Sequence, residues 1–118
     1  MNLEKFTERS REFIQAAQSI AIASEHQRIL PQHLLKVILE DEQDFSKNLL
    51  EKIGVDHRKL LVEVNRSFDK IPKVNSENSQ MYFDTQMLRV LEKAKSLAQK
   101  NADKFVPVER ILCALAAV

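Results

Sequence analysis

The chain has 118 residues, with 18 Lys and Arg against 17 Asp and Glu, one glycine and one cysteine. This length fits one soluble domain, and a single glycine excludes the Gly-rich phosphate loops, which need more than one. A net charge of +1, no Trp and one Tyr argue against a nucleic-acid-binding domain, and no apolar run approaches the ~18 residues that span a membrane. The lone cysteine cannot form an internal disulfide, which indicates a reducing compartment, and the polar amino terminus lacks the apolar stretch of a signal peptide, so we expect a cytoplasmic protein.

Helical periodicity dominates the amino-terminal part of the chain. The first predicted helix runs from about Thr7 to Ser24, and the Thr7 hydroxyl can cap its first turn. Its apolar face contains Phe13, Ala17 and Ile20. The second helix begins at Pro31, whose missing N–H costs nothing in a first turn, and it ends before the acidic residues 40–42.

Two further helices are predicted before a polar segment. The third ends at Gly54, because glycine best tolerates the left-handed position after a helix. The fourth follows Asp56 as N-cap and cannot continue past Pro72. Their apolar faces contain Phe45, Leu49 and Ile53 in the third helix, and Leu60, Leu61, Val64 and Phe68 in the fourth.

The polar stretch 73–80 (KVNSENSQ) lacks periodicity and is predicted to be a linker. Beyond it, Asp84 caps a fifth helix, and Pro107 opens a sixth that runs from Val108 to at least Leu115. The apolar face of the fifth helix contains Leu88, Leu91, Ala94 and Leu97.

The second half of the chain repeats the first at an offset of 77 residues. The matched segments are Phe6-Thr7 with Phe83-Asp84, Ser19-Ile20-Ala21 with Ser96-Leu97-Ala98, and Leu34-Leu35 with Ile111-Leu112. The shared caps and the equal connector length favour an internal duplication. Two ordinary helical hairpins with similar apolar faces are the alternative.

This duplication predicts a single all-α domain built as a pseudo-twofold duplicated four-helix unit. Repeat one occupies about 5–71, the linker 72–82 and a partial repeat two 83–118. The second copy is expected to be truncated, either because the chain is a fragment or because that unit is shorter.

Two segments resemble the repeat of the Clp N-terminal (double-repeat) domain family: 29–39 (ILPQHLLKVIL) and its echo at 106–112 (VPVERIL). Residues 1–7 (MNLEKFT) and 97–105 (LAQKNADKF) are more similar to the ClpB branch of that family than to its ClpA and ClpC branches. The order of these segments and the duplication carry the resemblance.

The resemblance implies a non-catalytic domain joined to the AAA+ ATPase rings of a hexameric disaggregase. Such a domain would engage unfolded or aggregated polypeptides for delivery to the ring pore, with an Hsp70-type chaperone system as a further partner. ATP and magnesium are expected in the rest of such a protein and no cofactor in this segment, which is expected to be monomeric when isolated. Two alternatives stay open: an adaptor-docking domain of a protease-linked Clp ATPase, and a free-standing helical protein or enzyme.

The resemblance also implies substrate-binding residues. Its polar positions match Thr7, Asp103 and Glu109, and candidates for its apolar peptide groove are Phe13, Ala17, Leu91 and Ile111. From the residues alone, Thr7 is explained as an N-cap, Glu109 as a first-turn acid favoured by the helix dipole, and Asp103 as an ordinary connector acid.

Three positions depart from the family's pattern. Lys93 and Arg110 stand where close relatives often carry apolar residues, which predicts a more basic or smaller groove. Gln32 occupies the acidic position of the first copy. Only Glu109 therefore fits the pair of acids with which ClpC-like domains recognise phosphoarginine, and we do not expect that activity.

The histidines and the cysteine are interpreted as structural. His26, His33 and His57 lack metal-ligand spacing, so no metal site is predicted. His33 is interpreted as a hydrogen-bonded packing residue, and Cys113 as a buried small hydrophobic residue. No Ser or Cys has a recognisable neighbouring base and orienting acid, so no catalytic site is expected.

Overall fold

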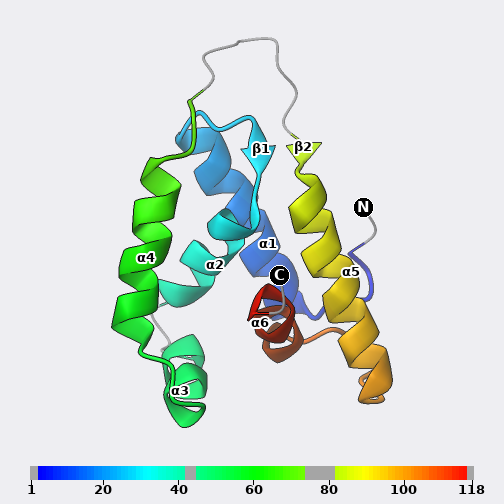
Figure 1. The fold of residues 1–118 in the computed structure, drawn as a ribbon. Coiled ribbons are helices and arrows are strands. Elements are labelled where there is room, and N and C mark those ends of the chain that lie inside the picture. The colour runs from blue at the N-terminus through cyan, green and yellow to red at the C-terminus, as the bar shows by residue number, and fades with distance from the viewer. Residues whose placement is uncertain (1–2, 42–44, 74–81, 117–118) are drawn as a thin grey trace.

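The computed structural model describes residues 3–41, 45–73 and 82–116, which are mainly helical (Figure 1). The elements in chain order are α1 (Glu8–Ala23), β1 (Arg28–Ile29), α2 (Pro31–Leu39), α3 (Phe45–Lys52), α4 (His57–Asp69), β2 (Tyr82–Phe83), α5 (Thr85–Lys100) and α6 (Val108–Ala116). All six predicted helices are confirmed. The predicted linker at 73–80, apart from Lys73, lies outside the described residues.

The helix ends follow the local signals in the sequence. Thr7 caps α1 by accepting a hydrogen bond at Oγ1 from the Ser10 N–H, at 3.1 Å. Asp56 and Asp84 cap α4 and α5 in the same way. Gly54, shortly after α3, has a φ of +81°, a conformation that glycine adopts without steric strain.

The structure confirms the internal duplication in detail. The bounds of α5 and α6 are those of α1 and α2 moved by 77 residues. Each first helix is followed by a residue in the left-handed region at the same position, Glu25 with φ 59° and Ala102 with φ 58°.

The connector that follows α1 bonds to the segment before α5, and the connector that follows α5 bonds to the segment before α1. The Thr7 N–H donates to the Val106 carbonyl at 3.1 Å, and the Asp84 N–H donates to the Ile29 carbonyl at the same distance. The offset takes Thr7 to Asp84 and Ile29 to Val106, so the two links are equivalent. Strands β1 and β2 pair in parallel around the second link, and an isolated parallel bridge, Phe6 with Val106, accompanies the first. An approximate twofold axis therefore relates the copies.

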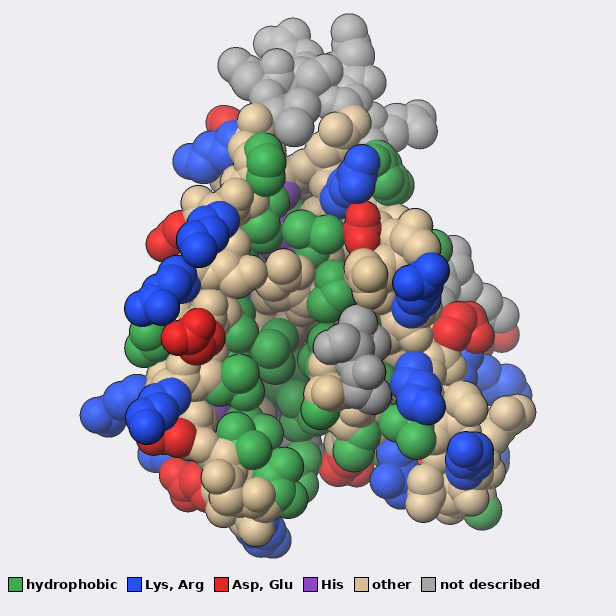
Figure 2. All heavy atoms as spheres, in the orientation of Figure 1, with side chains coloured by type: hydrophobic (Ala, Val, Ile, Leu, Met, Phe, Trp, Pro, Cys, Tyr) green, Lys and Arg blue, Asp and Glu red, His purple; other side chains and the backbone are tan. Residues whose placement is uncertain are grey.

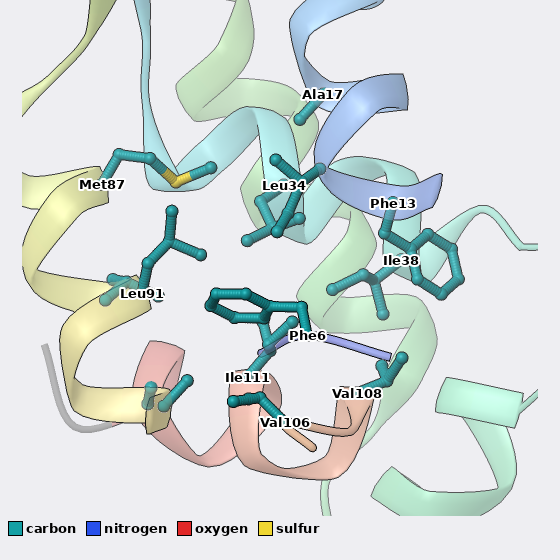
Figure 3. Close-up of a cluster of buried hydrophobic side chains, with 14 of the residues drawn as sticks. Phe6, Phe13, Ala17, Leu34, Ile38, Met87, Leu91, Val106, Val108 and Ile111 are labelled. Carbon is teal, nitrogen blue, oxygen red and sulfur yellow. The ribbon is translucent and has the colours of Figure 1, made fainter. Parts of the chain in front are cut away.

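The main core lies where α1, α2, α5 and α6 meet, and Phe6 is at its centre (Figure 3). Phe6 is 1% exposed and comes from the segment before α1. Side chains of both copies surround it, including Leu34, Leu91, Val106 and Ile111. A second cluster, Leu39, Leu50 and Val64, packs α2 against α3 and α4 at the side of the molecule opposite α5 (Figure 1).

Three predictions of burial are wrong. Leu88, which was predicted on the apolar face of α5, is 39% exposed and does not join the main core. Ile53 is 68% exposed because α3 ends at Lys52, so that Leu50 provides the buried contact of this helix. Cys113 is exposed because it lies on the side of α6 that faces away from the main core. In the described ranges, no helix is long and apolar enough to cross a membrane.

Candidate functional site

A cavity of about 540 Å³, here called the α3–α6 groove, opens between α3 and α6. Its lining is mainly apolar: Leu35, Leu49, Leu50, Ile53, Val55, Leu60, Leu112, Cys113, Leu115 and Ala116, with Glu109 and Arg110 as the charged members. Figure 2 shows hydrophobic side chains gathered in the hollow between the side of the molecule that carries α3 and α4 and the side that carries α5. The groove is therefore an open apolar surface with charge at one part of its rim.

The face of α6 that lines the groove is equivalent to the face of α2 that packs against α4. The equivalent face of α2 packs against α4, where Gln32 donates to the Ser67 hydroxyl and Lys36 donates to the Asn65 side chain. The offset takes Gln32 to Glu109, Lys36 to Cys113 and Leu39 to Ala116. These α6 residues line the groove, with Cys113 and Ala116 exposed and Glu109 half-buried.

Thr7 is tied to the connector between α5 and α6. Its Oγ1 donates to Ser10 Oγ at 2.9 Å, and Ser10 Oγ donates to the Val106 carbonyl at 2.9 Å. The Thr7 backbone N–H donates to the same carbonyl. Thr7 is thus an N-cap, as predicted, and it also joins the two copies.

Asp103 and Glu109 lie at opposite ends of that connector. Asp103 accepts a hydrogen bond at Oδ2 from Arg110 Nε, at 2.8 Å, and both side chains are partly exposed. This bond raises the pKa of Arg110 above its ordinary value. Glu109 lies in the first turn of α6, as predicted, and lines the groove. Hydrogen bonds link Thr7 and Asp103 to the connector and to α6, respectively, rather than to each other.

The four apolar candidates do not line a groove in the structure. Ala17, Leu91 and Ile111 are fully buried, and Phe13 is 7% exposed, so none presents a surface to a ligand. They occupy the helix faces that pack the two copies together, and the expectation of a groove there is wrong. The groove uses the neighbouring residues Leu112 and Leu115, and the continuous apolar run over 111–116 was the available signal in the sequence.

The two basic residues that depart from the family's pattern, Lys93 and Arg110, lie in different surroundings. Lys93 is exposed on α5 and does not line the α3–α6 groove. Arg110 does line it, beside Glu109 and Cys113. The expected change in the groove's character therefore has a structural basis at Arg110 only.

In the first copy, a buried pair of histidines, His26 and His33, occupies the positions equivalent to Asp103 and Arg110. His33 Nε2 lies 2.8 Å from His26 Nδ1, and His33 Nδ1 accepts the Leu30 N–H at 2.9 Å. These contacts assign the Nε2–H tautomer to His33, with His26 Nδ1 as the acceptor. Burial, then the proximity of His26, lowers the pKa of His33 to about 4, and burial, then the charge of Lys73, lowers the pKa of His26.

The packing role predicted for His33 is confirmed, but its partner His26 was missed. The offset takes His26 to Asp103 and His33 to Arg110, so the histidine pair and the ion pair are equivalent contacts of the two copies. The repeat alignment shows that the two pairs are equivalent, but the bonds themselves are seen only in the structure. Across the described part of the chain, no group of three or more His, Cys, Asp or Glu side chains could hold a metal ion.

Comparison with known proteins identifies the family. The family described as the Clp repeat (R) N-terminal domain matches residues 5–118. The chaperone protein ClpB of Mesorhizobium japonicum is 41% identical over 115 residues, which are 98% of this chain and 13% of that protein. The chain thus spans about one eighth of the length of this relative.

Solved structures agree with this assignment. The Hsp104 N-terminal domain from Candida albicans is 28% identical and superposes with a TM-score of 0.84, covering 95% of this chain and 73% of that one. A ClpV N-domain solved in complex with a VipB peptide has a TM-score of 0.77 at 16% identity, covering 97% of this chain and 71% of that one, which shows likeness of fold alone. The chain therefore belongs to the Clp repeat (R) N-terminal domain family and is of the ClpB and Hsp104 type.

Proposed function

We propose that the chain is a non-catalytic polypeptide-binding domain of a ClpB-type AAA+ disaggregase, and that apolar client segments bind in the α3–α6 groove. The observation that carries the proposal is the groove itself, an open apolar hollow with exposed Ile53 and Cys113 at its surface. Its volume of about 540 Å³ lies within the range of protein ligand sites. The clients would be unfolded or aggregated polypeptides, because these expose apolar side chains.

The size of the groove favours weak binding. Burial of one client side chain contributes about 1.5–3 kcal/mol. Association and ordering offset several kcal/mol of the sum of such contacts. A micromolar or weaker dissociation constant is expected. Display of several copies on a hexameric ring would raise the effective affinity.

The polar candidates form the flank of the proposed site. Glu109 is at the rim of the groove, and Asp103 reaches the rim through its bond to Arg110. Thr7, which is partly buried beside the same connector, extends this flank towards α1. In this proposal the four buried apolar candidates support the fold and do not contact clients.

The rest of the function belongs to a longer protein. We propose that the chain serves as the amino-terminal part of a cytoplasmic hexamer whose ATPase rings bind ATP and magnesium and receive clients from this domain, with an Hsp70-type chaperone system as a partner. Support comes from the family membership and from the identity with ClpB.

A second candidate function is the docking of a specific adaptor protein, as in the protease-linked Clp ATPases. It is favoured by the ClpV N-domain complex, in which a domain of this fold holds a peptide from one named protein. An adaptor-docking site would select one sequence, whereas a client site would bind many unrelated apolar segments. Affinities for a set of unrelated apolar peptides distinguish the two functions.

Titration with an unfolded model polypeptide, followed by amide NMR shifts, tests the proposal. We expect shifts at Leu49, Ile53 and Leu115 and about tenfold weaker binding in Ile53→Glu, because a charge at the groove surface replaces an apolar contact. Ile22→Glu is the matched control, since Ile22 is 63% exposed, against 68% for Ile53, and lies on α1 outside the groove. Equal effects of the two variants, or no shifts along the groove, would refute the proposal.

A further inference from the structure

A cleft of about 430 Å³, here called the α5 cleft, lies between α5, the segment before α1 and the connector that leads to α6. Its lining residues are Lys5, Glu92, Lys95, Ser96, Ala98, Gln99, Asp103, Lys104, Phe105 and Val106. None of them lines the α3–α6 groove, so the α5 cleft is a separate feature of the surface. It combines basic side chains with the ring of Phe105, which is 46% exposed.

The duplication shows that this face belongs to the surface of the repeat. Three residues of α1 are equivalent to cleft residues of α5 by the offset of 77: Gln15 to Glu92, Ser19 to Ser96 and Ile22 to Gln99. All three α1 residues are exposed, although α3 and α4 follow them in the first copy, because these two helices pack on α2 and on each other. The exposure of the α5 cleft is thus a property of the repeat.

The two copies differ in charge along their first helices. Helix α1 carries two basic and two acidic side chains, namely Arg9, Arg11, Glu8 and Glu12. Helix α5 carries four basic side chains and one acid, namely Arg89, Lys93, Lys95, Lys100 and Glu92. Figure 2 shows Lys and Arg side chains gathered over the side of the molecule that carries α5. The second copy therefore has an excess of positive charge along this helix that the first copy lacks.

Two of the ammonium groups in the cleft have no acidic partner in the described part of the chain. The carboxylates of Glu92 and Asp103 already have basic partners, at 3.4 Å and 2.8 Å. Lys5 and Lys104 are exposed, and neither forms an ion pair with a described residue. The ammonium of Lys104 lies 5.8 Å from the centroid of the Phe105 ring. The cleft thus presents two positive charges beside an exposed aromatic ring.

In the first copy, the side chains at two equivalent positions contact each other. The offset relates Phe105 to Arg28 and Lys5 to Tyr82. Arg28 Nε donates to the Tyr82 hydroxyl at 2.7 Å, and the Arg28 guanidinium lies 5.6 Å from the centroid of the Tyr82 ring. Among the described residues, Lys5 and Phe105 make no hydrogen bond or cation–π contact of this kind with each other. Both side chains therefore remain for a ligand.

We propose that the α5 cleft binds an acidic segment of a polypeptide, in which a Glu or Asp side chain pairs with Lys5 and Lys104 and a neighbouring apolar side chain packs on Phe105. A carboxylate accepts charge-assisted hydrogen bonds from ammonium groups, and the exposed ring offers apolar surface next to them. Nucleic acid fits less well, since its repeated phosphates would also meet the carboxylate of Glu92. The proposal does not rest on apolar binding in the α3–α6 groove.

Fluorescence anisotropy with two labelled peptides tests the proposal on the 118-residue chain. One peptide carries Glu-Phe-Glu between neutral flanks, and the other carries Gln-Phe-Gln between the same flanks. At about 50 mM salt we expect the acidic peptide to bind about five- to tenfold more tightly. The difference should shrink at about 500 mM salt, because salt screens exposed charges.

Variants of the cleft test its contacts one by one. Lys5→Gln combined with Lys104→Gln should reduce the preference for the acidic peptide to about twofold or less. The matched control is Lys59→Gln combined with Lys70→Gln, which makes the same change in net charge at two exposed lysines outside the cleft. Phe105→Ala should weaken binding of the acidic peptide about threefold, because it removes the apolar contact.

Three results would overturn the proposal. The first is equal binding of the two peptides, or equal effects of the cleft variant and the control variant. The second is tighter binding of a single-stranded DNA oligomer with the same net charge as the acidic peptide, because the cleft would then take phosphates. The third is loss of the acidic preference in Ile53→Gln, which would place the acidic peptide in the α3–α6 groove. Thermal unfolding of each variant establishes that it is folded.

The outcome is separate from that of the proposed function. Binding of a neutral apolar peptide in the α3–α6 groove should be weakened by Ile53→Glu and left unchanged by the two lysine substitutions in the α5 cleft. If the apolar peptide fails to bind while the acidic peptide shows the expected preference, the proposed function is wrong and the α5 cleft proposal stands. The converse pattern overturns the α5 cleft proposal alone.

Discussion

Mild acid should destabilise this domain through His33. The ring is fully buried, its Nδ1 accepts the Leu30 N–H, and its Nε2–H faces His26. A proton can be added to His33 only by breaking the bond to Leu30, and the resulting charge would be buried. The folded state therefore resists protonation until the pH falls to about 4, whereas the unfolded chain takes up this proton near pH 6.5.

The sign and magnitude of this change in the free energy of unfolding follow from the difference in proton binding between the folded and unfolded states. Between these two pKa values the unfolded state binds more protons, so the free energy of unfolding falls as the pH falls from 6.5 towards 4, and the contribution is complete below that. The full difference corresponds to about 3 kcal/mol, of which about 2 kcal/mol is lost between pH 7.5 and 5. His26, whose pKa is also lowered, acts in the same direction.

Charged groups from the neighbouring elements surround the pair. Lys36 of α2 reaches the Phe68 ring, and Asp69 of α4 and Lys73 lie with His26 around a shared hollow. The charge of Lys73 opposes protonation of His26. Acid is thus expected to loosen the packing of α4 on α2 at this corner first.

Urea unfolding followed by circular dichroism, repeated from pH 7.5 to 5, measures the effect. The comparison variant is His33→Gln, in which the side-chain oxygen can still accept the Leu30 N–H but cannot titrate. Both proteins share every carboxylate, so the difference between their pH profiles reports His33. We expect the variant to lose about 1–2 kcal/mol less than the wild type over this range. Parallel profiles would refute the reasoning.

Three other substitutions or reagents test separate parts of the structure. Phe6→Ala should lower the free energy of unfolding by about 3–5 kcal/mol, because it empties the centre of the core. Phe105→Ala, at a side chain 46% exposed, should change the free energy of unfolding by less than about 1 kcal/mol. Similar urea midpoints for the two variants would contradict the central role of Phe6. Ser10→Ala removes the buried hydroxyl that donates to Val106 and should cost about 1 kcal/mol by the same assay, a loss that would be absent if this link were unimportant. Cys113 should react with a thiol reagent in the folded chain at a rate within about tenfold of the unfolded chain, and an apolar peptide should slow the reaction; modification only after unfolding would place this thiol inside the core.

Local signals predicted most of the fold. The caps at Thr7, Asp56 and Asp84, the start at Pro31 and the turn at Gly54 are properties of a few neighbouring residues, and each is confirmed. The duplication was also visible, because an offset in the sequence needs no knowledge of how the copies pack.

The site was predicted less well because α6 has two apolar faces. Ile111 and Leu112 are adjacent and equally apolar, yet Ile111 is fully buried and only Leu112 also lines the groove. Periodicity identifies an apolar helix but does not rank its faces when the stripe is wide. The same ambiguity led to Cys113 being placed in the core.

The side-chain bonds across the connectors were also not predicted from the sequence. The bonds between His26 and His33 and between Asp103 and Arg110 join residues seven positions apart across a connector. Their formation depends on the left-handed turns at Glu25 and Ala102, and neither residue is a type that favours that conformation. No short pattern in the sequence announces such a turn.

The reciprocal backbone links between the two copies give the chain the topology of a covalently fused homodimer. In a twofold-symmetric dimer, any residue that contacts a second residue across the interface is matched by the reciprocal contact. The links from Thr7 to Val106 and from Asp84 to Ile29 are such a reciprocal pair. A single repeat could not close either link within itself, so it would have to associate with another copy to satisfy these backbone groups. The duplication turns an association that would depend on concentration into one that every chain carries.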